Sequence, residues 1–145
     1  MRIGHLKRIC VIDGHGGGIG AAVIKALKEA HGESIELVAL GTNAIAAAQM
    51  LKAGANRAAS GENAIRRTTA TADVIIGPIS IGWANAMLGE ITPKMAEAIM
   101  SSPAPKVFLP LAQEPVVIVG VSAEPLPHLI QQLVNQKLRE VLPDV

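Results

Sequence analysis

A glycine-rich loop that joins an apolar run to a helical pattern is the strongest constraint on what this chain can fold into. Five glycines stand within seven residues, directly after the apolar run 9–12: Gly14, Gly16, Gly17, Gly18 and Gly20. A strand that ends in such a loop and restarts as a helix leaves backbone N–H groups unpaired at the positive end of the helix, where a phosphate or carboxylate can bind. The alternative is that the glycines only permit a tight strand-to-helix crossing.

Strand and helix patterns alternate along the rest of the chain. Strands are predicted over residues 8–13, 35–40, 56–59, 73–77, 106–110 and 115–120, and helices over 19–31, 44–53, 61–67, 82–89, 93–101 and 126–142. Predicted helix caps are Thr42 or Asn43, Ser60, and Thr92 followed by Pro93. This alternation predicts a three-layer, Rossmann-like α/β fold, in which helices cover both faces of a mostly parallel sheet.

Two further expectations concern the organisation of the domain. Only four residues separate the last two predicted strands, too few for a parallel crossover, so we expect an antiparallel edge hairpin there. The 145 residues are expected to form a single Rossmann-like domain, with residues 1–7 as a short N-terminal extension.

Composition argues against several classes of protein. A net charge of +1 and an aromatic content of 1% provide neither attraction nor stacking surfaces for nucleic acid. No uncharged apolar run approaches the roughly 18 residues that span a bilayer. The one cysteine, Cys10, lies in an apolar strand, so neither a disulfide framework nor a metal site is predicted. We expect a cytoplasmic protein that binds neither nucleic acid nor membrane.

The carboxyl ends of the predicted strands locate the candidate site, because ligands of open α/β sheets bind there. The expected binding residues are Gly14, Gly16, Gly17, Gly18, Ile19, Gly20, Thr42, Asn43, Glu62 and Asn63. The candidates for catalysis are Asp13, His15 and Glu62.

Each polar candidate has a structural explanation beside the functional one. Asp13 can cap N–H groups of the loop, or it can bind a ribose or a metal. Asn43 can be a helix cap and nothing more. Glu62 and Asn63 can form a general base with an orienting amide, but the dipole of a first helical turn favours a glutamate on its own.

The glycine loop differs from two known phosphate-binding loops. Ala21 and Ala22 stand where a Walker loop needs Lys and Ser or Thr, so a Walker-type NTPase is rejected. The strict pattern G-x-G-x-x-G also fails, because Ile19 stands at its third glycine when the count starts at Gly14.

The spacing Gly14-x-x-x-Gly18-Ile19-Gly20 resembles the cofactor loop of the short-chain dehydrogenase/reductase family. The resemblance covers about the first 45 residues and implies a nucleotide or NAD(P) as the cofactor. This chain has no Tyr, however, so the Tyr–Lys pair of that family is missing. Gly41, Thr42 and Asn43 also replace the acidic residue that binds the NAD ribose. The cofactor therefore stays unknown.

Over nearly its whole length the chain resembles another family, small bacterial proteins classed as a domain of unknown function, DUF3842. The resemblance lies in the segments 11–14, 16–20, 39–44, 50–56, 61–65, 73–79, 87–90 and 125–129. It implies a nucleotide-binding-like α/β fold and supplies no activity. His15 departs from the pattern, which leads us to expect Gln or another polar residue at that position.

Two functions from different classes follow. The first is a small protein, an enzyme or not, that binds a nucleotide or another phosphorylated small molecule at the glycine loop. The second is a non-catalytic, homo-oligomeric structural or regulatory module in which the loop is purely architectural. We expect a homo-oligomer, a dimer first of all, in both cases. The reason is that Trp83, Met87, Met95 and Met100 cluster in a segment that a domain of this size is not expected to bury completely.

Overall fold

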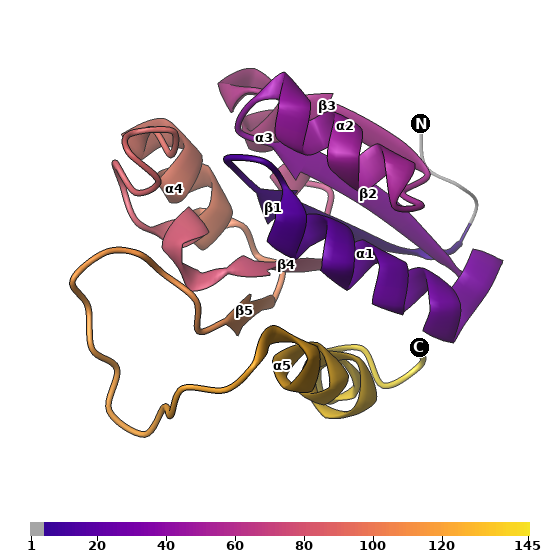
Figure 1. Ribbon diagram of the computed structural model, residues 1–145. Coiled ribbons are helices and arrows are strands. Elements are labelled where there is room, and N and C mark those ends of the chain that lie inside the picture. The colour runs from indigo at the N-terminus through magenta and orange to yellow at the C-terminus, as the bar shows by residue number, and fades with distance from the viewer. Residues whose placement is uncertain (1–4) are drawn as a thin grey trace.

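A five-stranded parallel sheet forms the centre of the protein (Figure 1), for which a computed structural model describes residues 5–145. The strands lie in the order β3-β2-β1-β4-β5, and each neighbouring pair is parallel. Their bounds are β1 (Lys7–Asp13), β2 (Ile35–Gly41), β3 (Arg57–Ser60), β4 (Val74–Pro78) and β5 (Lys106–Leu109). The predicted α/β fold with a parallel sheet is confirmed.

Helices connect these strands. They are α1 (Gly18–His31), α2 (Ala44–Lys52), α3 (Glu62–Thr69), α4 (Pro93–Ser101), α5 (Leu126–Gln132) and α6 (Leu138–Val141). A π-helical turn (Leu133–Lys137) joins α5 to α6, so the predicted last helix is one helical stretch. Short 3-10 helices occupy Gly32–Ser34 and Ile79–Gly82. Within residues 5–145, no helix has both the length and the apolar character needed to cross a membrane.

Two hydrophobic cores lie on opposite faces of the sheet. Ile9 and Val11 of β1 join the first core, together with side chains of α1, α2 and α5. Cys10 and Ile12 point to the second core, which α3 and α4 cover. Figure 1 shows α1 and α2 side by side over one part of the sheet. Because β1 is buried on both faces, its sequence is a continuous apolar run without polar alternation.

Side chains cap two of the helices as the sequence predicts. The Asn43 side chain accepts a hydrogen bond from the N–H of Ala46 at the start of α2, and Thr92 accepts one from Met95 in α4. The prediction for Ser60 is wrong, because the residue that precedes α3 is Gly61. Gly61 has a φ of 98° and provides no side-chain cap.

The helix predicted over residues 82–89 is also wrong. The 3-10 helix ends at Gly82, and the chain continues through turns in which Asn85, Met87 and Leu88 have positive φ angles of 69°, 57° and 56°. Left-handed residues cannot continue a right-handed helix. The spacing of apolar residues in this segment therefore reflects a turn whose buried side chains reach the second core.

The predicted strand 115–120 and its antiparallel hairpin are absent as well, since residues 110–125 form neither a helix nor a strand. We call residues 110–125 the strap. Figure 1 shows it as an orange loop between β5 and α5 that extends away from the body of the protein. Pro110 ends β5 and cannot donate to a ladder. The N–H groups of Val116 and Val121 donate within the strap, to Glu114 O and Ile118 O, which leaves them unavailable to the edge of β5.

The predicted N-terminal extension lies partly outside the described residues, which begin at His5. Its last residue, Lys7, is the first residue of β1.

A buried ion-pair network ties together the first three strands. Glu36 of β2 is fully buried and accepts hydrogen bonds from Arg8 Nε of β1 at 2.7 Å and from Arg57 Nη2 of β3 at 2.6 Å. Burial alone would raise the pKa of the Glu36 carboxyl, but the two guanidinium groups outweigh it and lower this pKa below its ordinary value of 4.5. Arg8, Glu36 and Arg57 lie at the amino ends of their strands. The network is therefore at the end of the sheet opposite the carboxyl ends of the strands.

We predict that Glu36→Gln lowers the free energy of unfolding by about 3–5 kcal/mol at pH 7, because two buried guanidinium groups lose their counter-charge. Since the folded-state pKa of Glu36 is lowered, its stabilisation is present above 4.5 and is lost as the pH falls through the folded pKa. Urea unfolding between pH 7 and pH 3 measures both effects. The control is Glu33→Gln, because Glu33 is an exposed partner of Lys28 worth about 1 kcal/mol or less. Equal losses in the two variants would contradict the prediction.

Candidate functional site

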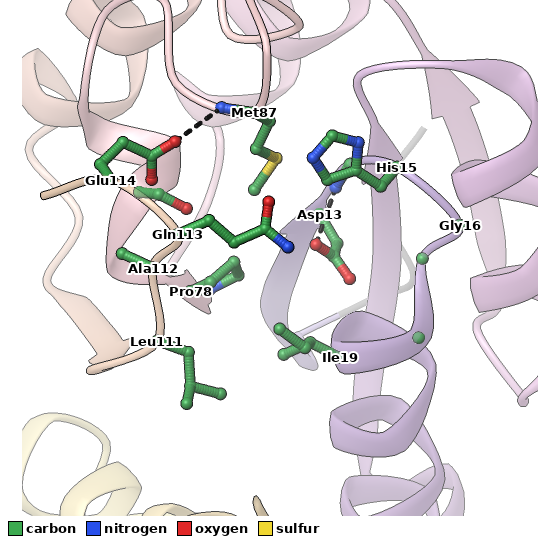
Figure 2. Close-up of a pocket in the computed structure, with 14 residues that line it drawn as sticks. Asp13, His15, Gly16, Ile19, Pro78, Met87, Leu111, Ala112, Gln113 and Glu114 are labelled. Carbon is green, nitrogen blue, oxygen red and sulfur yellow. Dashed lines mark hydrogen bonds between the residues drawn. The ribbon is translucent and has the colours of Figure 1, made fainter. Parts of the chain in front are cut away.

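A cavity of about 430 Å³ opens at the carboxyl ends of β1 and β4. The chain leaves β1 through α1 toward β2 on one side, and it leaves β4 toward β5 on the other, so the two loops diverge and leave a crevice between them. The cavity is lined by Asp13, Gly14, His15, Gly16, Gly17, Gly18, Ile19, Pro78, Ser80, Met87, Leu111, Ala112, Gln113 and Glu114. Figure 2 shows the glycine loop and Asp13 on one side, with Gln113 of the strap pointing toward Asp13, while the Glu114 carboxylate is directed to the N–H of Met87.

Asp13, the last residue of β1, supports the glycine loop from below. Its Oδ1 accepts a hydrogen bond from the N–H of Gly14 and its Oδ2 accepts one from Gly20, both at 2.7 Å. Burial raises the pKa of the Asp13 carboxyl above its ordinary value, and the N–H groups of Gly20 and Gly14 oppose this rise only in part. The structure therefore gives Asp13 the loop-capping role that the sequence offered as one alternative.

Internal packing explains three of the five loop glycines. A Cβ on Gly14 would lie 2.5 Å from Met87 Sδ, and a Cβ on Gly20 would lie 2.5 Å from Met50 Sδ. Gly17 has a φ of 77°, and its Cβ would lie 2.8 Å from the backbone of Ala46 in α2. These positions require glycine because the loop packs closely on its neighbours.

Gly16 and Gly18 are different. A Cβ at either position would meet nothing within 4 Å, and neither residue has a left-handed φ angle. Both line the cavity, and their N–H groups make no hydrogen bond to any of residues 5–145. The fold itself gives no reason for glycine at these two positions.

Glu90 joins the glycine loop to the loop that follows β2. Its Oε1 accepts hydrogen bonds from the His15 N–H at 2.8 Å, from Thr42 Oγ1 at 2.6 Å and from Asn43 Nδ2 at 2.9 Å. Its Oε2 lies 2.9 Å from His15 Nδ1. Burial would raise the pKa of Glu90, but the donors from Thr42, His15 and Asn43 outweigh it and lower this pKa below its ordinary value. Glu90 is thus an ionised acceptor around which the loops are ordered.

His15 combines a strained backbone with an oriented side chain. Its φ of 50° is uncommon for a residue with a side chain. The contact of its Nδ1 with Glu90 Oε2 at 2.9 Å fixes the orientation of the ring, so that Nε2 is on the side away from Glu90. In Figure 2 the far edge of the ring faces Met87 across the cavity. The arrangement is chemically able to support acid–base chemistry at the rim of the cavity.

The predicted binding residues divide into three groups. The glycine loop from Gly14 to Ile19 lines the cavity, and Gly20 lies directly behind it as a partner of Asp13. Thr42 and Asn43 do not line the cavity and act instead as donors to Glu90.

Glu62 and Asn63, the third group, begin α3 and are absent from the cavity lining. Glu62 Oε1 accepts a hydrogen bond of 2.6 Å from Thr92 Oγ1, the cap of α4, so it links two helices.

Several residues of the site were not among the predicted binding or catalytic residues, and they include Met87, Glu90, Gln113 and Glu114. Glu90 lies 75 positions from His15 in the chain, and Glu114 lies 27 positions from Met87. No local spacing connects such pairs. One signal for Glu90 was present in the sequence, its position beside the segment around Trp83, which made it a candidate to line either the cleft or a subunit contact.

The lining contains neither Lys nor Arg, so an anion in this cavity would depend on backbone N–H groups and on His15. Among residues 5–145, no group of three or more His, Cys, Asp or Glu side chains is placed to hold a metal ion.

A family model matches residues 8–142 of this chain, and its description is a domain of unknown function, DUF3842. The chain belongs to this family. None of the curated proteins matches the chain. Membership of DUF3842 agrees with the resemblance seen in the sequence.

We predict that Glu90→Gln loosens the glycine loop. An amide has one acceptor oxygen and two N–H donors, so at least one of the donors that surround Glu90 loses its partner, and the charge opposite His15 is lost. We expect the free energy of unfolding to fall by about 1–3 kcal/mol. Hydrogen exchange at the amides of residues 15–18 should become faster.

The matched control is Glu97→Gln, an exposed glutamate on α4. This variant should leave the exchange of the loop amides unchanged. Equal exchange in the Glu90 variant and the wild type would mean that Glu90 does not order the loop.

Proposed function

We propose that this protein binds a nucleotide or another phosphorylated small molecule at the glycine loop. The observation that carries the proposal is the open space at Gly16 and Gly18. Glycine at a helix start lowers the stability of the fold, because it loses more conformational entropy on folding than other residues do. A glycine that has no packing role is therefore explained by a ligand that approaches its backbone closely. The free N–H groups of the same two residues are suitable donors to a phosphate oxygen.

The shape and chemistry of the cavity support the same class of ligand. Its volume of about 430 Å³ lies in the range of small-molecule sites. The loop provides a polar end, while Ile19, Pro78 and Leu111 provide apolar walls, which Figure 2 shows below Asp13 and Gln113. A phosphate at the loop and a less polar group, such as a nucleobase, between these apolar walls would match both ends.

The test is a pair of leucine variants at opposite ends of α1. Gly18→Leu fills the open space at the loop, whereas Ala30→Leu changes an exposed residue in the last turn of the same helix. A ligand at 100 times its Kd stabilises the wild type by about 2.7 kcal/mol. We expect this stabilisation to persist in Ala30→Leu and to disappear in Gly18→Leu. Without ligand, Gly18→Leu should be at least as stable as the wild type, because leucine is the better helix former.

Thermal melts with a panel of nucleotides and phosphate esters provide the measurement. Mass spectrometry of the supernatant from denatured, natively purified protein provides candidate ligands. The proposal is wrong if no compound shifts the melting temperature and no ligand co-purifies. It is also wrong if Gly18→Leu binds as well as the wild type.

A homo-oligomeric module is the second candidate function, and one observation favours it. Val117 and Val119 of the strap are 93% and 97% exposed, and Leu88 is 96% exposed. Exposed apolar side chains that gather on one surface commonly become interfaces. Two of the methionines on which the oligomer was predicted, Met87 and Met95, are instead buried in the second core.

We predict that the double variant Val117→Ser, Val119→Ser shifts the protein toward smaller species in size-exclusion chromatography with light scattering. Serine removes the apolar surface and preserves an extended, exposed loop. Ser122→Ala, an exposed change in the same strap, is the control. A wild-type protein that is monomeric at every concentration would contradict the oligomer proposal and would leave the ligand proposal intact.

A further inference from the structure

The strap is attached to the rest of the protein by few contacts. None of its residues is buried, and those that are half-buried are Pro110, Leu111, Glu114 and Ile118. Over residues 112–123, one hydrogen bond reaches another part of the described chain, from the N–H of Met87 to Glu114 Oε2 at 3.1 Å. Figure 2 shows this bond as a dashed line. A segment with so few buried contacts opens locally at a low free energy.

The strap also arches over space that its side chains do not fill. Two hollows of about 330 and 520 Å³ lie between it and the body of the protein. Residues 116–118 of the strap and Trp83 line the first, and residues 120–122 and Phe108 of β5 line the second. Figure 1 shows the same segment extending away from the sheet. The position of the strap therefore depends on its two ends and on the bond to Met87.

That bond holds the strap in place only by burying the other oxygen of the same carboxylate. Glu114 Oε1 is buried and has no hydrogen-bond partner within residues 5–145. A buried carboxylate oxygen without a donor loses its solvation without compensation. When the strap moves away from Met87, both oxygens return to water. The burial of Oε1 thus offsets part of the stabilisation that the bond to Oε2 contributes.

We propose that the strap is a lid of the cavity at the carboxyl ends of β1 and β4, and that Glu114 is its latch. In the closed form, which the structure shows, residues 111–114 make one wall of this cavity. The open form breaks the bond to Met87 and removes that wall, so small molecules enter and leave from this side. The strap turns about its ends, where β5 ends at Leu109 and α5 begins at Leu126. The lid does not depend on the proposed phosphate site at the glycine loop.

Trp83 makes the opening of the strap measurable. It is the one tryptophan of the chain, and it lines the first hollow together with Val117. Val117 is 93% exposed, so a Val117→Cys variant can be labelled with monobromobimane. Cys10, the one natural cysteine, is buried and does not compete for the label. Because tryptophan quenches bimane on contact, the label is dark while the strap is closed and fluorescent while it is open.

We expect the labelled protein to switch between the dark and the fluorescent state on the microsecond-to-millisecond timescale of lids, measured by fluorescence correlation at concentrations too low for association. Replacing Trp83 by Phe in the labelled protein should leave it fluorescent throughout. In Glu114→Gln the amide oxygen still accepts from Met87, and the buried group without a partner becomes neutral. We expect the open fraction to fall about threefold or more, because an unpaired neutral group costs less to bury than an unpaired charge.

The control is Glu124→Gln, at the other end of the strap. Glu124 is exposed and binds Gln132 of α5, so this variant should leave the open fraction unchanged. A hydrogen bond that only supports a fixed loop predicts the opposite result for Glu114→Gln, since an amide oxygen is a weaker acceptor than a carboxylate. An unchanged or larger open fraction in Glu114→Gln therefore overturns the latch. A label that stays dark, or stays fluorescent, in the protein with native Trp83 and Glu114 overturns the lid itself. Neither result affects the phosphate site, which the Gly18→Leu variant tests.

Discussion

The Glu90 carboxylate connects three segments that the chain brings together from distant positions. The glycine loop follows β1, Thr42 and Asn43 follow β2, and Glu90 itself follows the turns beyond β4. To reach this place, the chain before Glu90 passes through three residues other than glycine with positive φ angles, which are unfavourable for L-residues. Burial of Met87 in the second core and the donors around Glu90 offset this strain. The strained residues thus lie directly beside the cavity, where they bring Met87 to its wall and Glu90 to the glycine loop.

The glycines of the loop fall into two groups that the sequence alone could not separate. Gly14, Gly17 and Gly20 let the loop pack on Met87, Ala46 and Met50, which is the architectural explanation. Gly16 and Gly18 face open space, which the architectural explanation does not cover. The two alternatives that the sequence left open therefore apply to different residues of the same loop. The proposed ligand would account for Gly16 and Gly18 alone, and the observation behind it is the open space at these two positions.

Elements with strong periodic patterns were predictable from the sequence, and so was the edge of the sheet where the site would lie. Pro93 after Thr92 located the start of α4, because both the cap and the fixed φ of proline act within a few residues. The segments 82–89 and 115–120 were predicted wrongly because their apolar residues suit a helix or a strand locally. In the structure, left-handed residues turn the first segment, and the strap pairs its N–H groups internally. Glu114 escaped prediction because its partner, the N–H of Met87, lies 27 positions away in the chain.

The acidic residue beneath the loop limits what the loop can hold. Asp13 occupies the N–H of Gly20, so the first turn of α1 offers fewer donors to an anion than an uncapped helix start would. Gly16 and Gly18 line the cavity and their N–H groups have no partner within residues 5–145, and two such donors match a single phosphate group better than a pyrophosphate. Burial also raises the pKa of Asp13, so its charged form is already disfavoured. A nearby phosphate would shift this pKa further in the same direction, because like charges oppose ionisation. Under the proposed function, the loop therefore suits a ligand with one phosphate group better than the pyrophosphate of a dinucleotide.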